Sequence, residues 1–152
     1  MILTTHALVG AALGKNISNP WLIAIVAIPL HFFLDHFRHG EYLGRQSSVR
    51  KTWWKVALDL LIGFSIIAAY IFITHPAISI IRNILLGTFL SMLPDLATLL
   101  YWKLHFTFLR KIFQFHERVH PFPKGDQRYD WNLRNARNDI LLSLLAIILL
   151  LI

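Results

Sequence analysis

The chain has 152 residues, a length that suits one domain and is too short for two of ordinary size. Hydrophobic residues make up 56% of it and charged residues 15%, below the roughly one quarter that is usual, so the composition favours a membrane protein. The net charge is +7, and the absence of cysteine excludes disulfides, iron–sulfur clusters and cysteine nucleophiles, which leaves histidine and carboxylate side chains as metal ligands.

Five apolar segments predict an all-α fold, a single polytopic membrane bundle of about five helices over residues 1–152. Three of them, residues 21–37, 53–73 and 79–102, have about 17 to 24 residues, enough to cross a hydrocarbon core of roughly 30 Å. The terminal segments, 2–14 and 140–152, have about 13 residues each, or roughly 20 Å as helices. We interpret these two as short spans, half-inserted helices or packed partners of the longer three.

Local signals refine the individual helices. The first residues lack a basic region and a clear cleavage site, so no removable signal peptide is expected. Gly10 and Gly14 form a small-xxx-small face that lets another helix approach closely. A bend is expected at Pro29, and Pro94 with Asp95 is expected to interrupt the third long segment.

Basic residues lie between the first two long segments (Arg38 to Lys55) and after the third (Lys103 to Arg137). The turn between the second and third long segments, residues 74–79, has none. The positive-inside rule therefore predicts a multi-pass protein of the inner (cytoplasmic) membrane with both basic loops in the cytoplasm. The charge of +7 is then mainly a topology signal, so the expected partner is the lipid bilayer and not nucleic acid. Residues 102–115 are expected to form an amphipathic helix along the inner membrane surface.

With this orientation, most of the acids and histidines fall at one depth, near the cytoplasmic boundary. His31, Asp35 and His39 are spaced by four residues and share one stripe of a helix, whereas His36 points away from it. An isolated Asp inside a membrane costs about 2.5–3.5 kcal/mol, so Asp35 and Asp95 favour a shared polar site. Imidazoles and carboxylates suit a divalent metal, with Zn²⁺ favoured and Mn²⁺ or Fe as alternatives.

Residues 116–120, HERVH, match H-E-x-x-H, in which two histidines at i and i+4 face one ion and the glutamate acts as a base. Glu117 would be that base, and a third ligand would come from elsewhere, for instance Asp95. Pro121 and Pro123 follow directly, so the motif is expected at a helix end, unlike the helix interior of metalloproteases. A metalloprotease is therefore an alternative interpretation. His75 and His105 are interpreted as lying outside the site.

Four short motifs occur in order along the chain: TH at 5–6, HFFLDHFRH at 31–39, LPDL at 93–96 and HERVH at 116–120. This set resembles the small bacterial and archaeal membrane proteins described as predicted membrane-bound metal-dependent hydrolases, which are distantly similar to zinc-dependent phospholipase C. The chain departs from their pattern at PDLAT, which lacks a second acid, and at VHPF, where Thr-His-Ser is common. By this resemblance the expected metal ligands are His6, His31, Asp35, Asp95, His116 and His120.

The expected activity is hydrolysis by a metal-bound water, whose pKa the cation lowers toward 7. Asp35 or Glu117 is the expected general base, and His39 and Asp59 are additional candidates for the site. The position at headgroup level suggests a phosphoester, such as a phospholipid, or another headgroup bond as substrate. The main alternative is a non-enzymatic membrane protein whose His/Asp cluster is a structural polar network or a structural metal site. Asp59 can also simply pair with Lys55, one turn away on the same helix.

Overall fold

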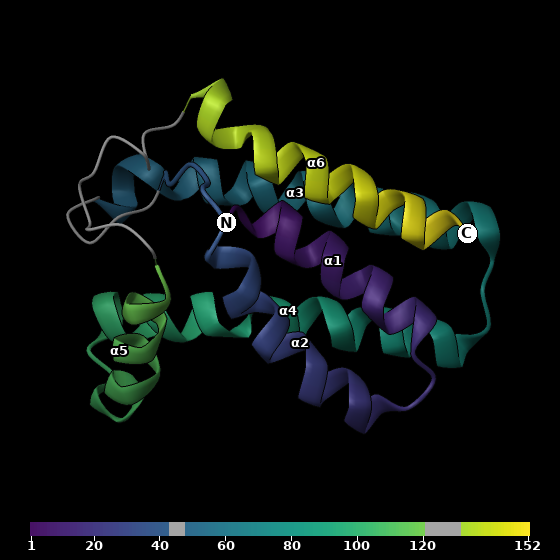
Figure 1. Ribbon diagram of the computed structural model, residues 1–152, viewed down its shortest axis with the longest axis horizontal. Coiled ribbons are helices and arrows are strands. Elements are labelled where there is room, and N and C mark those ends of the chain that lie inside the picture. The colour runs from purple at the N-terminus through teal and green to yellow at the C-terminus, as the bar shows by residue number, and fades with distance from the viewer. Residues whose placement is uncertain (43–47, 121–131) are drawn as a thin grey trace.

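The computed structural model describes residues 1–42, 48–120 and 132–152. Pro121, Pro123 and the basic residues Arg45, Lys124 and Arg128 lie outside the described residues. The described ranges form six α-helices and one short 3₁₀ turn and contain no strand; Figure 1 shows how the helices are arranged. They are α1 (Leu3–Asn16), α2 (Pro20–Asp35), α3 (Val49–Thr74), α4 (Ile78–Leu104), η1 (Thr107–Leu109), α5 (Arg110–Val119) and α6 (Leu133–Leu151).

The all-helical fold is confirmed, but the expected five-helix arrangement is not. The segment predicted as one amphipathic helix, residues 102–115, is broken where His105 adopts a left-handed conformation (φ 58°) and ends α4. The chain then passes through η1 into α5, which is a sixth helix. The last helix begins at Leu133, seven residues before the apolar run, because Asn132 caps it by accepting the Asn135 backbone N–H at 3.0 Å.

The interruption expected at Pro94 is wrong, because α4 continues through this residue to Leu104. Proline removes one backbone donor and leaves the carbonyl of Leu90, four residues earlier, without its partner within the helix, but contacts with a neighbouring helix make such a turn tolerable. Pro94 is buried in the helix packing, and the carbonyl of Ser91, three residues earlier, contacts Nδ1 of His31 on α2 at 2.7 Å. The proline-containing turn of α4 is therefore held by the neighbouring helix.

Helix α1 is the centre of the molecule and lies against α2, α3, α4 and α6 (Figure 1). A Cβ atom on Gly10 would lie 2.3 Å from the Gly87 carbonyl oxygen, and one on Gly14 would lie 2.0 Å from that of Asn83. The backbones of α1 and α4 thus touch directly, which confirms the predicted small-residue face. This close approach brings the start of α1 to the same level as Asp95 on α4.

Two carboxylates fix the N-terminal end of α1. Asp59 on α3 accepts the backbone N–H groups of Leu3 and Thr4 at 2.7 and 3.1 Å, and Asp139 on α6 accepts that of Ile2 at 3.1 Å. Negative charge is favoured there because the first N–H groups of a helix have no partners within it. The Tyr42 hydroxyl also donates to Asp59 at 2.5 Å, and burial together with this carboxylate raises the pKa of Tyr42.

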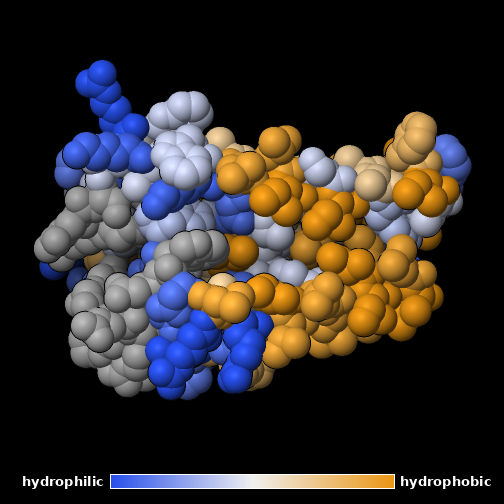
Figure 2. All heavy atoms as spheres, turned by 90° about the horizontal axis from the view of Figure 1, so that it is seen from above, coloured by the Kyte–Doolittle hydropathy of each residue, from blue (hydrophilic) through white to orange (hydrophobic). Residues whose placement is uncertain are grey.

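Two helices, Arg50–Thr74 and Ile78–Leu104, are long and apolar enough to cross a membrane, and α2 is apolar but shorter. Near the turn that joins them, Phe72 and Ile78 are 77% and 80% exposed. Figure 2 shows apolar side chains covering one end of the long axis and polar side chains gathered at the other. The histidines and acids of interest come from the polar end, where α2 ends and α5 begins (Figure 1).

Candidate metal centre

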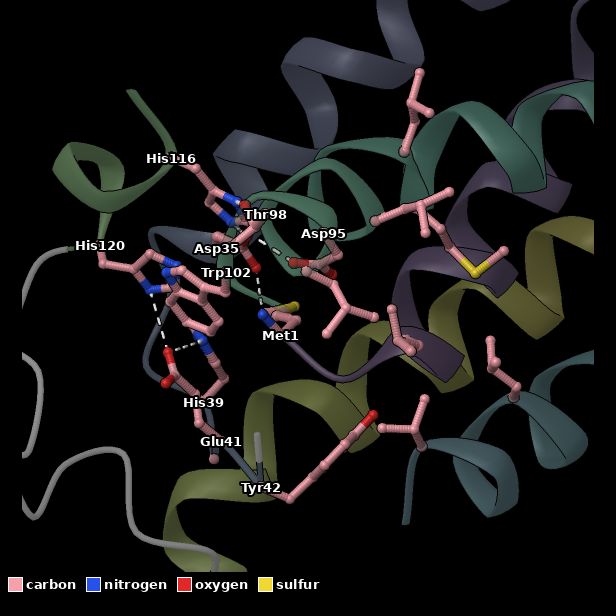
Figure 3. Close-up of a pocket in the computed structure, with 18 of the residues that line it drawn as sticks. Met1, Asp35, His39, Glu41, Tyr42, Asp95, Thr98, Trp102, His116 and His120 are labelled. Carbon is pink, nitrogen blue, oxygen red and sulfur yellow. Dashed lines mark hydrogen bonds and ion pairs between the residues drawn. The ribbon is translucent and has the colours of Figure 1, made fainter. Parts of the chain in front are cut away.

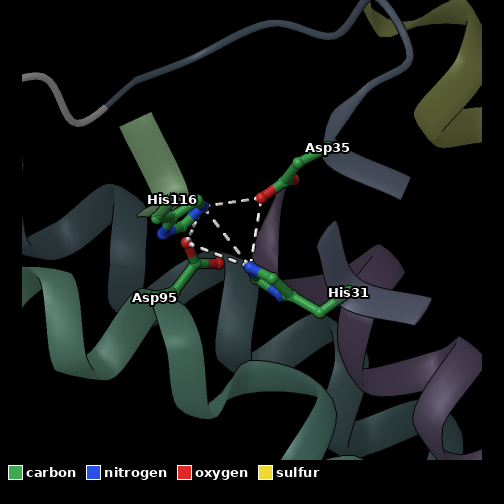
Figure 4. Close-up of side chains that lie close together, drawn as sticks. All are labelled: His31, Asp35, Asp95 and His116. Carbon is green, nitrogen blue, oxygen red and sulfur yellow. Dashed lines mark hydrogen bonds and ion pairs between the residues drawn. The ribbon is translucent and has the colours of Figure 1, made fainter. Parts of the chain in front are cut away.

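Four side chains from three helices converge at the polar end of the molecule. His31 and Asp35 come from α2, Asp95 from α4 and His116 from α5, and one ligand atom of each lies within 4.8 Å of all the others (Figure 4). We call this group the primary cluster. His31, Asp35 and His116 are buried, and Asp95 is 27% exposed. The i, i+4 spacing of His31 and Asp35 places both on one stripe of α2, as predicted.

The separations between these atoms, from 2.8 to 4.0 Å, lie on both sides of those around a tetrahedral metal ion. Nε2 of His31 and Nε2 of His116 lie 3.1 and 2.8 Å from Oδ2 of Asp35, and 3.4 Å from each other. The same two nitrogens lie 4.0 and 3.7 Å from Oδ1 of Asp95. Ligands at about 2.0–2.2 Å from a tetrahedral ion are roughly 3.3–3.6 Å apart, within the range seen here.

Contacts on the far side of each imidazole orient it toward the cluster. Nδ1 of His31 lies 2.7 Å from the Ser91 carbonyl oxygen, which can only accept, so Nδ1 carries the proton. Nδ1 of His116 lies 2.8 Å from the Thr98 hydroxyl. Partners of this kind fix the ring and leave Nε2 for a metal, as in known metal sites. At the end of α2, Nδ1 of His36 contacts the Val119 carbonyl at 3.2 Å and ties α5 to α2.

The donor set fits a divalent cation. With Nδ1 of His31 protonated, a neutral ring points a bare nitrogen at another imidazole and two carboxylates. Such a group needs positive charge, which can come from a metal ion, from additional protons on the rings or from the neighbouring α-amino group of Met1. Two nitrogens and two oxygens are the ligand types that Zn²⁺ takes, and Mn²⁺ or Fe would need more oxygen ligands.

His6, on α1, joins the primary cluster at its edge. Its Nε2 lies 3.1 Å from Oδ1 of Asp35 and 3.9 Å from Oδ2 of Asp95, and its ring stacks on His31 at 4.1 Å. The α-amino group of Met1 also donates to Oδ1 of Asp35. Asp35 is therefore contacted by three imidazoles and an ammonium group, which explains how a carboxylate only 1% exposed is accommodated.

A second group of metal-ligating side chains lies beside the first. Oε1 of Glu41 lies 3.7 Å from Nε2 of His39 and 3.5 Å from Nδ1 of His120, and the donor atoms of these three residues lie within 4.8 Å of one another. The His116 and His120 rings stack with centroids 5.2 Å apart, so the two groups are neighbours. Both line a cavity of about 340 Å³ (Figure 3).

The protonation of this second group suits ligands. Burial lowers the pKa of His120 to about 4, against the opposing effect of the nearby carboxylates Asp35 and Glu41. Burial alone would raise the pKa of Glu41, but its contacts with His39 and His120 hold it below the ordinary value. A neutral imidazole and an ionised carboxylate are the forms that bind metal ions.

The predicted residues divide among three places. His6, His31, Asp35, Asp95 and His116 meet as expected, and Glu117 lines the same cavity. His116 and His120 were expected to face one ion, but they belong to different groups because α5 ends at Val119 and His120 leaves the helix. Asp59 accepts hydrogen bonds at the start of α1 instead of joining either group, and Nζ of Lys55 lies over the Trp54 ring, 5.7 Å from its centroid. His75 and His105 end α3 and α4 away from both groups.

Sequence reasoning missed Glu41. The available signal was its position two residues after His39, in the short segment that follows α2. Comparison of the chain with family models, curated proteins and solved structures finds no match.

Proposed function

We propose that this protein is a membrane-embedded, metal-dependent hydrolase that acts at the level of the lipid headgroups, on a phosphoester. The observation that carries the proposal is the convergence of two oriented imidazoles and two carboxylates from α2, α4 and α5 on one small volume. Its motifs, in their order along the chain, also resemble the membrane-bound metal-dependent hydrolases, and membership of that family is part of the proposal. Zn²⁺ is the favoured ion.

A divalent cation in the primary cluster would supply an acidified water, with a pKa near 7, as the nucleophile, and this water would bind as a fifth ligand beside the four side chains. The roles of the side chains follow from their surroundings. Asp35 is fully engaged by His6, His31 and His116, which suits a ligand. Glu117 lines the cavity beside the cluster, so we assign the general base to Glu117 in preference to Asp35. Asp95, which is 27% exposed, is the most exposed of the four proposed ligands.

The proposed setting is the inner membrane, with α3 and α4 as spans and the basic loops on the cytoplasmic side. The exposed apolar side chains of α3 and α4 support these two helices as spans, and Figure 2 shows that polar side chains gather at one end of the molecule. Helix α5, on which Arg110 and Phe115 are exposed, would then lie in the headgroup layer. The metal centre would meet an ester bond at that depth.

The non-enzymatic alternative is favoured by one observation. The imidazoles of His6, His31 and His116 already lie within 3.1 Å of Asp35, so protonated rings could neutralise the carboxylates without an ion. A metalloprotease is less favoured, because the two histidines of HERVH belong to different groups.

Metal content separates these alternatives. We expect protein purified in mild detergent to carry stoichiometric Zn²⁺, Mn²⁺ or Fe by elemental analysis. His116→Ala and Asp95→Ala should lower the affinity for that ion by about tenfold or more, since each removes a ligand. His105→Ala is the matched control, because that ring ends α4 outside both groups. A parent protein that holds no ion after dialysis against Zn²⁺ would leave the polar network as the better interpretation.

Catalysis requires a second measurement. Turnover of a panel of phospholipids and soluble phosphoesters should depend on added metal, and Glu117→Gln should lose turnover while it keeps the ion. Metal-independent turnover, or none with any substrate, would contradict the hydrolase.

A further inference from the structure

The cavity beside the metal centre has two chemically different ends. Its polar end carries Asp35, Asp95 and His116 together with the second histidine group. From there the cavity continues along apolar side chains of α3 and α4 (Figure 3). On α3 these are Val56, Leu60 and Phe64, and on α4 they include Phe89, Leu93 and Leu96.

The spacing of these side chains makes two facing stripes. Val56, Leu60 and Phe64 recur every four residues, and Phe89, Leu93 and Leu96 follow at i, i+4 and i+7. Helices α3 and α4 hardly touch each other, because α1 lies between them and contacts both. Helix α1 therefore forms the base of the space between the stripes, to which it contributes Leu3.

The apolar part of the cavity is open sideways. Phe64, Phe89 and Leu96 line it and are still 40%, 52% and 41% exposed. The helices on either side of the opening are the two that are long and apolar enough to cross a membrane. In a bilayer this opening would face hydrocarbon, so that a lipid chain could enter without crossing water.

The length of the stripes suits one leaflet. From Val56 to Phe64 is about 12 Å along α3 and from Phe89 to Leu96 is about 10 Å along α4, at 1.5 Å per residue. Half of a hydrocarbon core of roughly 30 Å is about 15 Å. A hydrocarbon chain that enters between these helices would thus have its headgroup end at the primary cluster.

We propose that the cavity between α3 and α4 is a binding site for a single hydrocarbon chain of a membrane lipid, entered laterally from the bilayer. The placement of the lipid's phosphate ester at the primary cluster rests on the proposed function. The chain site itself does not depend on it. Aliphatic and aromatic walls with polar groups at only one end are the chemistry that recognises such an amphiphile.

The test places the full chain in phosphatidylcholine nanodiscs that contain a phosphatidic acid with a diazirine in the middle of one acyl chain. After irradiation, adducts are mapped by mass spectrometry. We expect adducts concentrated on the α4 wall at Phe89, Met92 and Leu96, and few on Leu85, which is 49% exposed on the same helix but outside the cavity. Equal labelling of all exposed α4 residues would overturn the proposal.

A substitution that fills the cavity can be compared with the same substitution just outside it. Leu60→Trp places an indole in the cavity and should cause a several-fold loss of adducts on the α4 wall. Leu61→Trp makes the same change at a neighbouring position that is 63% exposed and does not line the cavity, and it should cause none. If Leu60→Trp does not give a monodisperse protein, Phe64→Trp with Phe72→Trp as its control replaces the pair. Equal labelling in the cavity variant and its control would exclude a chain at this position.

Metal content measured on the same samples keeps the two proposals apart. Selective labelling in a protein without metal would support the chain site and count against the hydrolase. Stoichiometric metal without selective labelling would retain the metal centre and remove the chain site.

Discussion

At the scale of single residues, the metal centre depends on contacts to Nδ1 of the imidazoles, on the side of each ring that faces away from the cluster. Nδ1 of His31 lies against a backbone carbonyl, which no side-chain substitution can remove, whereas Nδ1 of His116 lies 2.8 Å from the Thr98 hydroxyl. Thr98 is therefore the position at which orientation can be changed without touching a ligand.

Thr98→Val removes that hydroxyl and keeps the shape of the side chain. Loss of a partner behind a metal-bound histidine typically costs about 10–100-fold in metal affinity, and we expect a decrease of that size. Competition with a chelator of known Zn²⁺ affinity measures it, and Thr98→Ser should restore tight binding. Thr74→Val, at a hydroxyl that bonds only the Tyr70 carbonyl one turn away, should leave the affinity unchanged. Equal affinities in the two valine variants would show that the hydroxyl does not position His116.

Asp59 and Asp35 show how two buried carboxylates in adjacent helices take different roles. Asp59→Asn weakens the acceptor for two backbone N–H groups and the Tyr42 hydroxyl, and it removes negative charge at the start of α1. We expect a loss of about 1–3 kcal/mol in the free energy of unfolding with metal content unchanged. Thermal unfolding in detergent, followed by elemental analysis, checks both. Metal loss without destabilisation would instead place Asp59 in the site.

At the scale of helices, the contact between α1 and α4 determines whether the ligands meet. The Gly87 position tests it, because a Cβ atom there would lie 2.1 Å from the Gly10 carbonyl oxygen, a backbone atom that cannot move aside alone. Gly87→Ala should destabilise by about 1–3 kcal/mol through overpacking, and it should weaken metal binding by displacing Asp95 relative to His6. Gly63→Ala is the milder comparison, since its Cβ would lie 3.3 Å from the Cα of Thr4, a contact that a shift of a few tenths of an ångström relieves. Similar melting temperatures for the two variants would contradict the close approach.

Local periodicity predicted part of this arrangement. The apolar runs predicted both ends of α3 and α4 to within a few residues. The small-residue spacing predicted the close contact of α1 with another helix, and the spacing of His31 and Asp35 predicted that they share one stripe of α2. Pro121 and Pro123 indicated the helix end at HERVH, but the division of His116 and His120 between two groups could not be predicted in this way, because it depends on how α5 packs against α2. Glu41 was missed for the same reason, since it lies outside any helix and only packing brings it to His39 and His120.

At the scale of the whole molecule, the proposed function requires the polar end and the turn between α3 and α4 to lie on opposite sides of the bilayer. The basic residues near α5 predict that this end is cytoplasmic and that the turn, which has no basic residue, is outside. Because the chain has no cysteine, single introduced thiols report on each side separately.

Ala77→Cys in the turn and Gln114→Cys on α5 both introduce a thiol at an exposed position. We expect a membrane-impermeant maleimide to label Ala77→Cys in intact spheroplasts, and to label Gln114→Cys only after the membrane is permeabilised. Mass spectrometry of the purified variants measures the labelled fraction, and the cysteine-free parent gives the background. Labelling of both thiols in intact spheroplasts would place both ends of α4 on one side, and α4 could not then be a span. The reverse pattern would turn the metal centre outward, where its substrate would have to come from the other leaflet.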